Sequence, residues 1–325
     1  MLPFLLGLGL FVVLLQRTGI GAIVTGFRLV GSGLILLAVT CGLRYWLRTV
    51  VWYYSIEPSQ RWLGLFQLFK IRLAGETFGE LMFAGLLMGE SAKALAASRW
   101  LPGISAFSSL FIENLLFGLS VVVFLASGVV ILLSSALFPA RVLALALTLT
   151  VPLALSALFL FLLLHYRWRL LGPLLDFLEN KPTIWGGLKP IASQVRNFED
   201  TVHAFYRDHQ SLFFLLLGLE FTTHLVGVIE AYWTLHWIQG HGTWLASFLV
   251  ESANRLINSF FSIIPLRIGV DEGAMAVVLQ AIGYPGSIGI SLALVRKARL
   301  LVWMVPGMFL IRKYSLLASD RPLRS

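Results

Sequence analysis

Residues 263 to 275 read IIPLRIGVDEGAM, from Ile263 to Met275, and lie between two long apolar segments. A helix in lipid must pair its backbone polar groups, and it disfavours helix breakers and charged side chains. This stretch nevertheless holds a proline, two glycines, an arginine and two acids. We therefore interpret it as a broken or re-entrant helix, in which Pro265 ends one arm and Gly269 allows the turn. Asp271 and Glu272 are expected near the start of the next arm, where the helix dipole favours acids.

The composition of the chain indicates a membrane protein. Of its 325 residues, 58% are hydrophobic and 13% are charged, and the mean hydropathy is +0.85. Soluble domains are about 45–50% apolar and about 25% charged. Several windows of about twenty residues carry few or no charges, which is the length that crosses a hydrocarbon core. We predict an all-α polytopic membrane protein that forms a single transmembrane domain over residues 1–325.

Apolar runs along the chain predict about seven or eight spanning helices, with one or two re-entrant or broken segments. The run at 63–90 carries several charges, and 265–283 is short and interrupted, so neither is expected to be a simple crossing. The first run lacks the basic start and cleavage site of a signal peptide, and we interpret it as a short span. The runs are 2–15, 31–53, 63–90, 105–135, 142–164, 211–238, 244–264 and 286–311.

The longest polar stretch, 166–210, is predicted to be a cytoplasmic amphipathic segment in the membrane interface. Its leucines and aromatic residues fit one face of an interfacial helix. Lysine and arginine mark the cytoplasmic side of membrane proteins, and this stretch has more of them than the other connections. They are Arg167, Arg169, Lys181, Lys189, Arg196 and Arg207.

Several classes of function find little support in the sequence. The net charge is +9, but the basic residues stand mostly at the ends of apolar runs and form no patch for nucleic acid. With a single cysteine, Cys41, the chain has no cysteine metal site, and we expect no metal and no cofactor. Common hydrolase and nucleotide-binding motifs are absent. His203 and Asp208 fit a His-x-x-x-x-Asp acyltransferase spacing, which is a pattern of low specificity.

Two interrupted segments, one in each half of the chain, share a pattern. Residues 83–95 read FAGLLMGESAKAL, in which a small residue precedes Gly89 and Glu90. In the second half, Pro265 precedes Gly269, which is followed by Glu272. Paired interrupted segments point to a binding site in transporter-like folds and to an internal inverted repeat. The residues expected to shape these broken helices are Gly89, Pro265, Gly269 and Gly273.

Ionisable side chains inside the apolar runs are the candidate site. Such groups are costly in a membrane, so they usually face the bundle interior and mark a function. Opposed charges in a water-filled groove suit a lipid headgroup, because arginine binds phosphate as a fork and carboxylates bind ammonium groups. We expect Arg48 and Arg255 to clamp a phosphate. The predicted substrate-binding residues are Arg48, Glu76, Glu80, Glu90, Glu220, His224, Arg255, Arg267, Asp271 and Glu272.

Structural roles compete with this interpretation at several positions. Arg48 can snorkel from the end of a span beside an aromatic belt. Glu251 precedes Arg255 by four residues, the order that favours an ion pair within a helix. His224 fits a packing hydrogen bond as well as a site. Glu272 can serve a helix start without contacting any lipid.

Four short motifs follow the pattern of one family. Arg48 with Trp52 is similar to an Arg-Trp pattern that ends the second span. Residues 75–93, GETFGELMFAGLLMGESAK, look like a Gly-Glu segment followed by a base, although Ala84 stands near the usual proline. Residues 112–114, Ile-Glu-Asn, are weakly similar to a Glu-Arg-x-x-Asp stretch, and residues 265–273 to a Pro-x-x-x-Gly-x-x-Glu element. The chain thus resembles the flippase-like family related to the transmembrane domain of lysylphosphatidylglycerol synthase, the multiple peptide resistance factor.

The resemblance implies lipid translocation between leaflets of a bacterial inner membrane, with two re-entrant hairpins lining a groove. Stand-alone members include a subgroup associated with hopanoids, and because the chain ends at Ser325 we expect no synthase domain. The expected function is a flippase for a phospholipid or a hopanoid-like lipid. The alternatives are a membrane enzyme of lipid or glycolipid metabolism and an accessory subunit of a lipid-biosynthesis complex. Expected partners are membrane lipids, with a homodimer or lipid-biosynthesis enzymes as the protein partners considered.

Overall fold

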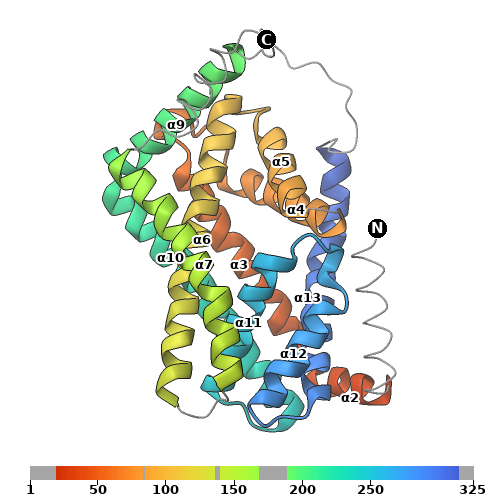
Figure 1. Cartoon of the computed structure of the whole chain (residues 1–325). Coiled ribbons are helices and arrows are strands. Elements are labelled where there is room, and N and C mark those ends of the chain that lie inside the picture. Colours follow the sequence, from red (N-terminus) through yellow and green to blue (C-terminus); the bar gives the residue numbers. More distant parts are fainter. Residues whose placement is uncertain (1–19, 83–84, 136–139, 168–188, 315–325) are drawn as a thin grey trace, which may run out of the picture.

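A computed structural model shows that the chain is all-α, as the sequence predicts (Figure 1). The structure describes residues 20–82, 85–135, 140–167 and 189–314, and no strand occurs among them. The predicted first span, 2–15, lies outside these residues. The short α2 (Ile20–Val30) was not anticipated from the sequence. The other helices are α3 (Gly33–Ser55), α4 (Leu65–Leu81), α5 (Gly85–Ala97), α6 (Gly103–Ser135), α7 (Ala140–Tyr166), α9 (Lys189–Asp208), α10 (Gln210–Gln239), α11 (Trp244–Phe261), α12 (Val270–Ala281) and α13 (Gly286–Lys313), with 3-10 turns η1 (Pro58–Gln60) and η2 (Pro265–Arg267).

Within the described residues, four helices are long and apolar enough to cross a membrane: α3, α6, α7 and α10. Their outer surfaces carry large apolar side chains, such as Leu155 on α7 and Val130 on α6, which are well exposed. A membrane supplies the apolar surroundings that such a surface requires. The helix α13 is also long enough, at about 42 Å, but it carries Arg296, Lys297 and Arg299 near its middle. These features make the chain an all-α membrane protein.

The apolar run predicted at 63–90 forms two helices instead of one. The helix α4 ends at Leu81, α5 begins at Gly85, and the two pack along each other as a hairpin (Figure 1). Glycines allow the two backbones to touch, because a Cβ on Gly79 would lie 2.6 Å from the Gly85 carbonyl oxygen and one on Gly89 would lie 2.9 Å from that of Gly75. With about 1.5 Å of rise per residue, the two helices are about 25 and 20 Å long. Both are shorter than a hydrocarbon core of about 30 Å.

The second interrupted segment also forms a hairpin, from α11 through η2 to α12. The break falls at Pro265–Gly269, where Leu266, Arg267 and Gly269 all have positive φ angles of 51°, 46° and 83°. The backbone N–H of Gly269 donates a 2.8 Å hydrogen bond to Glu272 Oε2, so this carboxylate caps α12. The capping role considered for Glu272 is therefore present in the structure.

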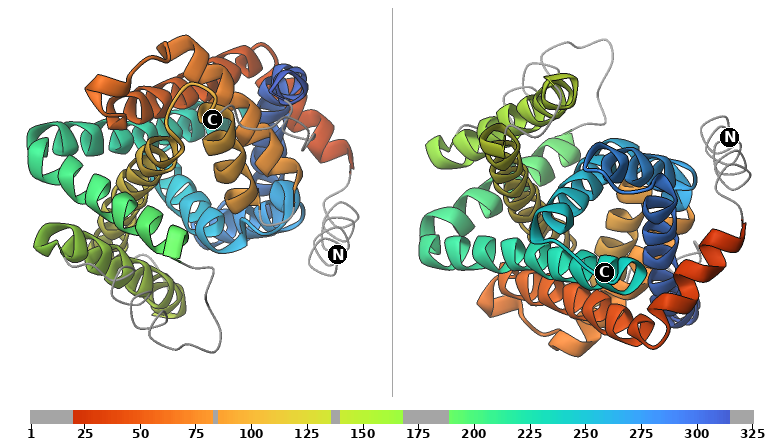
Figure 2. Two further views of the ribbon diagram at one scale, coloured as in Figure 1. Left: turned by 90° about the horizontal axis from the view of Figure 1, so that it is seen from above. Right: turned by 90° about the horizontal axis from the view of Figure 1, so that it is seen from below.

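Five helices pack in a closed ring in the order α3, α10, α11, α12, α13 and back to α3, as the views along the bundle show (Figure 2). The hairpin of α4 and α5 packs on α13, α3 and α6. To one side, α9 packs on α6 and α7 and buries Val202, Phe205 and Tyr206. The leucines that suggested an amphipathic segment lie at 170–178, outside the described residues, so the interfacial placement of 166–210 stays a prediction.

Candidate functional site

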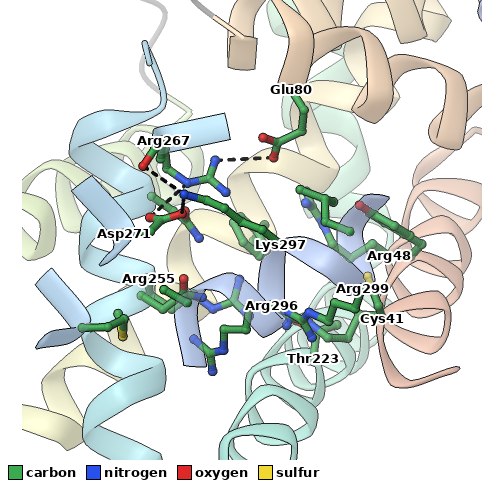
Figure 3. Close-up of a pocket in the computed structure, with 18 residues that line it drawn as sticks. Cys41, Arg48, Glu80, Thr223, Arg255, Arg267, Asp271, Arg296, Lys297 and Arg299 are labelled. Atoms are coloured by element: carbon green, nitrogen blue, oxygen red, sulfur yellow. Dashed lines mark hydrogen bonds and ion pairs between the residues drawn. The ribbon is translucent and has the colours of Figure 1, made fainter. Parts of the chain in front are cut away.

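A cavity of about 150 Å³ lies inside the ring of helices, where the two hairpins approach each other (Figure 3). Its wall includes residues of α3, α4, α6 and α10 to α13. Basic side chains outnumber acidic ones on this wall, so the cavity surface is positively charged. The charged residues that line it are Arg44, Arg48, Glu80, Arg255, Arg267, Asp271, Arg296, Lys297 and Arg299.

The tips of the two hairpins meet at the cavity. Arg267 Nη1 of η2 lies 3.4 Å from Glu80 Oε1, near the end of α4, and Arg267 Nε lies 3.4 Å from Asp271 Oδ1. Lys297 Nζ of α13 donates to the Arg267 carbonyl oxygen at 3.3 Å (Figure 3). The same Nζ also donates to Glu272 Oε1 at 2.6 Å. We call Glu80, Arg267, Asp271, Glu272 and Lys297 the tip network. It joins segments that are 187 residues apart in the sequence.

A second set of charges fastens the α4–α5 hairpin to α3 and α6. Arg72 pairs with Glu76 Oε1 at 3.2 Å and with Glu113 Oε1 at 3.1 Å. Lys93 lies 3.0 Å from Glu76 and 2.6 Å from Glu90. In this hairpin network, each acid has at least one close cation. Its members are Arg48, Arg72, Glu76, Glu90, Lys93 and Glu113.

Arg48 was expected to clamp a phosphate, but it is largely committed to protein groups. Its Nε donates to Glu113 Oε1 at 2.9 Å, and its Nη2 lies 2.6 Å from the same oxygen. The guanidinium also stacks on Phe117, at 4.0 Å from the ring centroid. The second acid near Arg48, Glu220, is 3.8 Å away and fully buried, and neither of its carboxylate oxygens has a hydrogen bond. Arg48 thus serves the helix packing as well as the cavity wall.

A third set of charges, the arginine cluster, lies in the part of the cavity formed by α3, α10, α11 and α13. Glu251 is shared by Arg255 at 2.6 Å, Arg296 at 2.9 Å and Arg44 at 3.7 Å. Glu230 pairs with Arg299 and lies 3.5 Å from Arg44. Both glutamates are completely buried. The cluster comprises Arg44, Glu230, Glu251, Arg255, Arg296 and Arg299.

The sequence model of one family, described as the lysylphosphatidylglycerol synthase TM region, matches residues 1–307. The chain belongs to this family. No curated protein and no solved structure matches it. The match confirms the resemblance inferred from the short motifs. It makes the chain a membrane protein of lipid metabolism or transport.

Of the ten substrate-binding residues predicted from the sequence, the structure places five on the cavity wall, and their role in binding stays a prediction. Arg48, Glu80, Arg255, Arg267 and Asp271 line the cavity itself. The other five lie behind the wall and contact lining residues or neighbouring helices. They are Glu76, Glu90, Glu220, His224 and Glu272.

His224 has the packing hydrogen bond that was considered as an alternative to a site role. Its Nε2 lies 2.9 Å from Ser120 Oγ, and the ring is completely buried. Phe117 and Phe124 flank it at centroid distances of 5.5 and 5.2 Å. His224 therefore links α10 to α6.

The predicted break residues differ in position. Pro265 and Gly269 lie at the turn, whereas Gly273 lies inside α12 and Gly89 lies inside α5, packed on the α4 backbone. Ala84, the small residue near the first Gly-Glu pair, lies outside the described residues. Gly89 therefore allows two helices to pack closely, whereas Gly269 allows the chain to turn.

Arg44, Arg296 and Arg299 are cavity residues that the predicted site did not include. Their spacing carried a signal, because Arg44 and Arg48 are four residues apart and Arg296 and Arg299 are three apart. Each pair therefore shares one helix face.

The acyltransferase-like pair does not form the arrangement that such catalysis requires. Asp208 lies against Arg207, with oxygen to nitrogen distances of 2.5 and 2.7 Å, instead of orienting His203. The hydrogen bonds from Arg207 hold the pKa of the Asp208 carboxyl below its ordinary value. Among the described residues, no three His, Cys, Asp or Glu side chains are grouped as a metal site needs.

Proposed function

We propose that the protein moves a polar-headed lipid between the leaflets of a bacterial inner membrane, with the headgroup passing through the charged cavity. The observation that carries this proposal is the meeting of two short helical hairpins at a cavity lined by charged side chains, inside an otherwise apolar bundle. Charges buried at membrane depth are costly unless they face a water-filled path or a polar ligand. A path for a polar headgroup accounts for them.

The two hairpins fit re-entrant elements of such a path. Each has an arm shorter than the hydrocarbon core, and each places polar residues at its tip. In transporter folds, broken helices of this kind bring backbone donors and acceptors to a site near the middle of the membrane. The acyl chains would remain in the lipid outside the ring while the headgroup enters the cavity.

The orientation follows from the basic residues. Arg167, Arg196 and Arg207 belong to the polar region around α9, and the last turn of α13 carries Arg312 and Lys313. Lysine and arginine favour the cytoplasmic side. We therefore place α9 in the cytoplasmic interface of a multi-pass protein. The enzyme alternative gains no support from His203 and Asp208, which are not paired.

A leaflet-exchange assay with the purified protein in vesicles tests this function. Fluorescent phospholipid in the outer leaflet is quenched, and the protected fraction reports exchange. We expect exchange above that of protein-free vesicles, and a loss of about tenfold or more for a variant with Arg267→Gln and Asp271→Asn, because charge-assisted hydrogen bonds contribute about 1.5–3 kcal/mol each. The Arg207→Gln variant, altered outside the bundle, is the matched control. Equal rates for protein-free vesicles and all three proteins, across phospholipids and a hopanoid-like lipid, would contradict the proposal.

A further inference from the structure

We propose that the arginine cluster binds the phosphate group of an anionic headgroup, an inference that rests on the proposed function and names its substrate class. The cluster holds four arginines, Arg44, Arg255, Arg296 and Arg299, but only two acids, Glu230 and Glu251. Its formal charge is therefore +2. The tip network and Glu220 balance this charge from behind, but the cavity wall itself carries seven basic and two acidic side chains. A ligand in the cavity meets that wall first, and an anion is therefore favoured there.

The guanidinium groups of the cluster retain unused hydrogen-bond donors. Arg255, Arg296 and Arg299 are only 5%, 8% and 9% exposed. The Nε atom of each of these arginines, and Nη1 of Arg296, donate no hydrogen bond within the protein. A buried donor without an acceptor costs about 1–3 kcal/mol. These atoms are closed off from the cavity, so a ligand there is reached only by the parts of the guanidinium groups that line the wall.

The four arginines approach the cavity from three sides. Arg44 comes from α3, Arg255 from α11, and Arg296 and Arg299 from α13, as the close-up shows for the last three (Figure 3). A cavity of about 150 Å³ is about ten times the 10–15 Å³ that a single water molecule requires by this measure. It therefore has room for a phosphate group with part of its ester.

A phosphate fits this arrangement better than a carboxylate or an ammonium group. Its oxygens can accept from several guanidinium forks at once, and arginine binds phosphate in a bidentate manner. A cationic headgroup would meet the positive wall unfavourably. The two acids on the wall, Glu80 and Asp271, each already lie 3.4 Å from Arg267. The cavity in this form therefore selects for negative charge.

Lipid phosphates and free phosphate share this chemistry, so the test uses both. The full-length protein in neutral detergent is titrated with phosphatidylglycerol, glycerol 3-phosphate and inorganic phosphate, and binding is followed by native mass spectrometry and by thermal unfolding. A diacyl glycolipid with the same chains and no phosphate is the comparison ligand. We expect phosphatidylglycerol to bind at least about tenfold more tightly than the glycolipid, the ratio that about 1.4 kcal/mol produces. Binding of the two water-soluble probes would identify free phosphate as a second source, and binding of the lipid alone would identify the headgroup.

The variant Arg255→Gln tests the assignment to this cluster, because Glu251 keeps Arg296 and Arg44 as partners. We expect phosphatidylglycerol affinity to fall about tenfold or more, in line with a charge-assisted hydrogen bond. Lys297→Gln is the matched control on the same cavity wall, and it should change the affinity less. Equal affinities for the lipid and the glycolipid in the unmodified protein, or equal losses in the two variants, would overturn the proposal. If the protein exchanges lipids between leaflets but does not prefer phosphatidylglycerol to the glycolipid, this inference is rejected and the proposed function stands. If it binds the phosphate ligands but exchanges no lipid, only the proposed function is rejected.

Discussion

The hairpin network and the arginine cluster are both buried sets of charges, yet they differ in how completely they are paired. In the hairpin network, Arg72 and Lys93 lie between acids on their own hairpin and Glu113 of α6. In the arginine cluster, four guanidinium groups share two carboxylates, whereas the hairpin network has three basic and three acidic members. Paired charges hold helices together, whereas an excess of one charge sign at a cavity favours binding of a ligand of the opposite charge. The pairing, rather than the presence of charge, distinguishes the two roles.

The largest effect is expected from Glu251→Gln. This change removes a carboxylate that three arginines share and leaves the cluster with Glu230 alone. Removing one partner of a buried ion pair costs about 3–5 kcal/mol. We expect a marked fall in the unfolding temperature of the purified protein in detergent.

The matched change in the hairpin network is Glu90→Gln. The Glu90 side chain is 22% exposed, and Lys93 would keep Glu76 as a partner, so a smaller loss is expected. Similar unfolding temperatures for the two variants would contradict the proposed difference between the networks. Added phosphatidylglycerol should not rescue Glu251→Gln fully, because its headgroup does not replace the buried carboxylate.

The next effect concerns the glycine contact that holds the α4–α5 hairpin together. In Gly79→Ala, the new methyl group would lie 2.6 Å from the Gly85 carbonyl oxygen, so the two helices must separate. Overpacking of this kind costs about 1–3 kcal/mol. In the control Gly118→Ala, on α6, nothing lies within 4 Å of the new methyl group, and the helix gains about 1 kcal/mol from the better propensity of alanine. The two variants should shift the unfolding temperature in opposite directions, and a shift in the same direction would count against the close contact.

An effect of similar size is expected at the turn of the second hairpin. Gly269 has a φ angle of 83°, which an L-residue with a side chain rarely adopts. Gly269→Ala should cost about 1–3 kcal/mol through backbone strain and loosen the cap that Glu272 gives to α12. Gly64→Ala is the control, since Gly64 has a φ angle of −68° and open space around it. A fall in unfolding temperature for Gly269→Ala but not for Gly64→Ala would show that backbone strain, and not the added methyl group, causes the loss.

Much of the fold could be predicted from the sequence because membrane helices obey simple rules. Apolar length located α3, α6, α7 and α10, and helix breakers located the turn at Pro265–Gly269. The first hairpin was harder. The sequence has no proline between the end of α4 at Leu81 and the start of α5 at Gly85, and Gly89, which marked this segment, serves helix packing. A glycine in a turn and a glycine in a helix contact look alike in a sequence.

Five of the ten predicted site residues line the cavity, but the ion pairs that they form could not be predicted. Burial within apolar runs marked Arg255, Arg267 and Asp271 correctly as cavity residues. Local spacing predicts partners only within one helix, as for Glu251 and Arg255. It gives no information on which arginines of α3 and α13 share the same glutamate, since that depends on how the ring closes. The excess positive charge at the cavity therefore emerges only from the folded arrangement.

The smallest effect is expected from an exposed ion pair, which serves as the reference for both buried networks. Arg207 and Asp208 form a close pair at the surface, and the hydrogen bonds from Arg207 lower the Asp208 carboxyl pKa. A lowered carboxyl pKa adds stability at pH values above the ordinary range of the group, and this stability is lost as the pH falls through the pKa of the folded state. Water and salt screen such a pair. Asp208→Asn should therefore leave the unfolding temperature at neutral pH almost unchanged, and any small difference should vanish at acidic pH or in high salt. A large change would mean that ion pairs stabilise this protein as much at the surface as inside the bundle. The contrast between the hairpin network and the arginine cluster would then lose its physical basis.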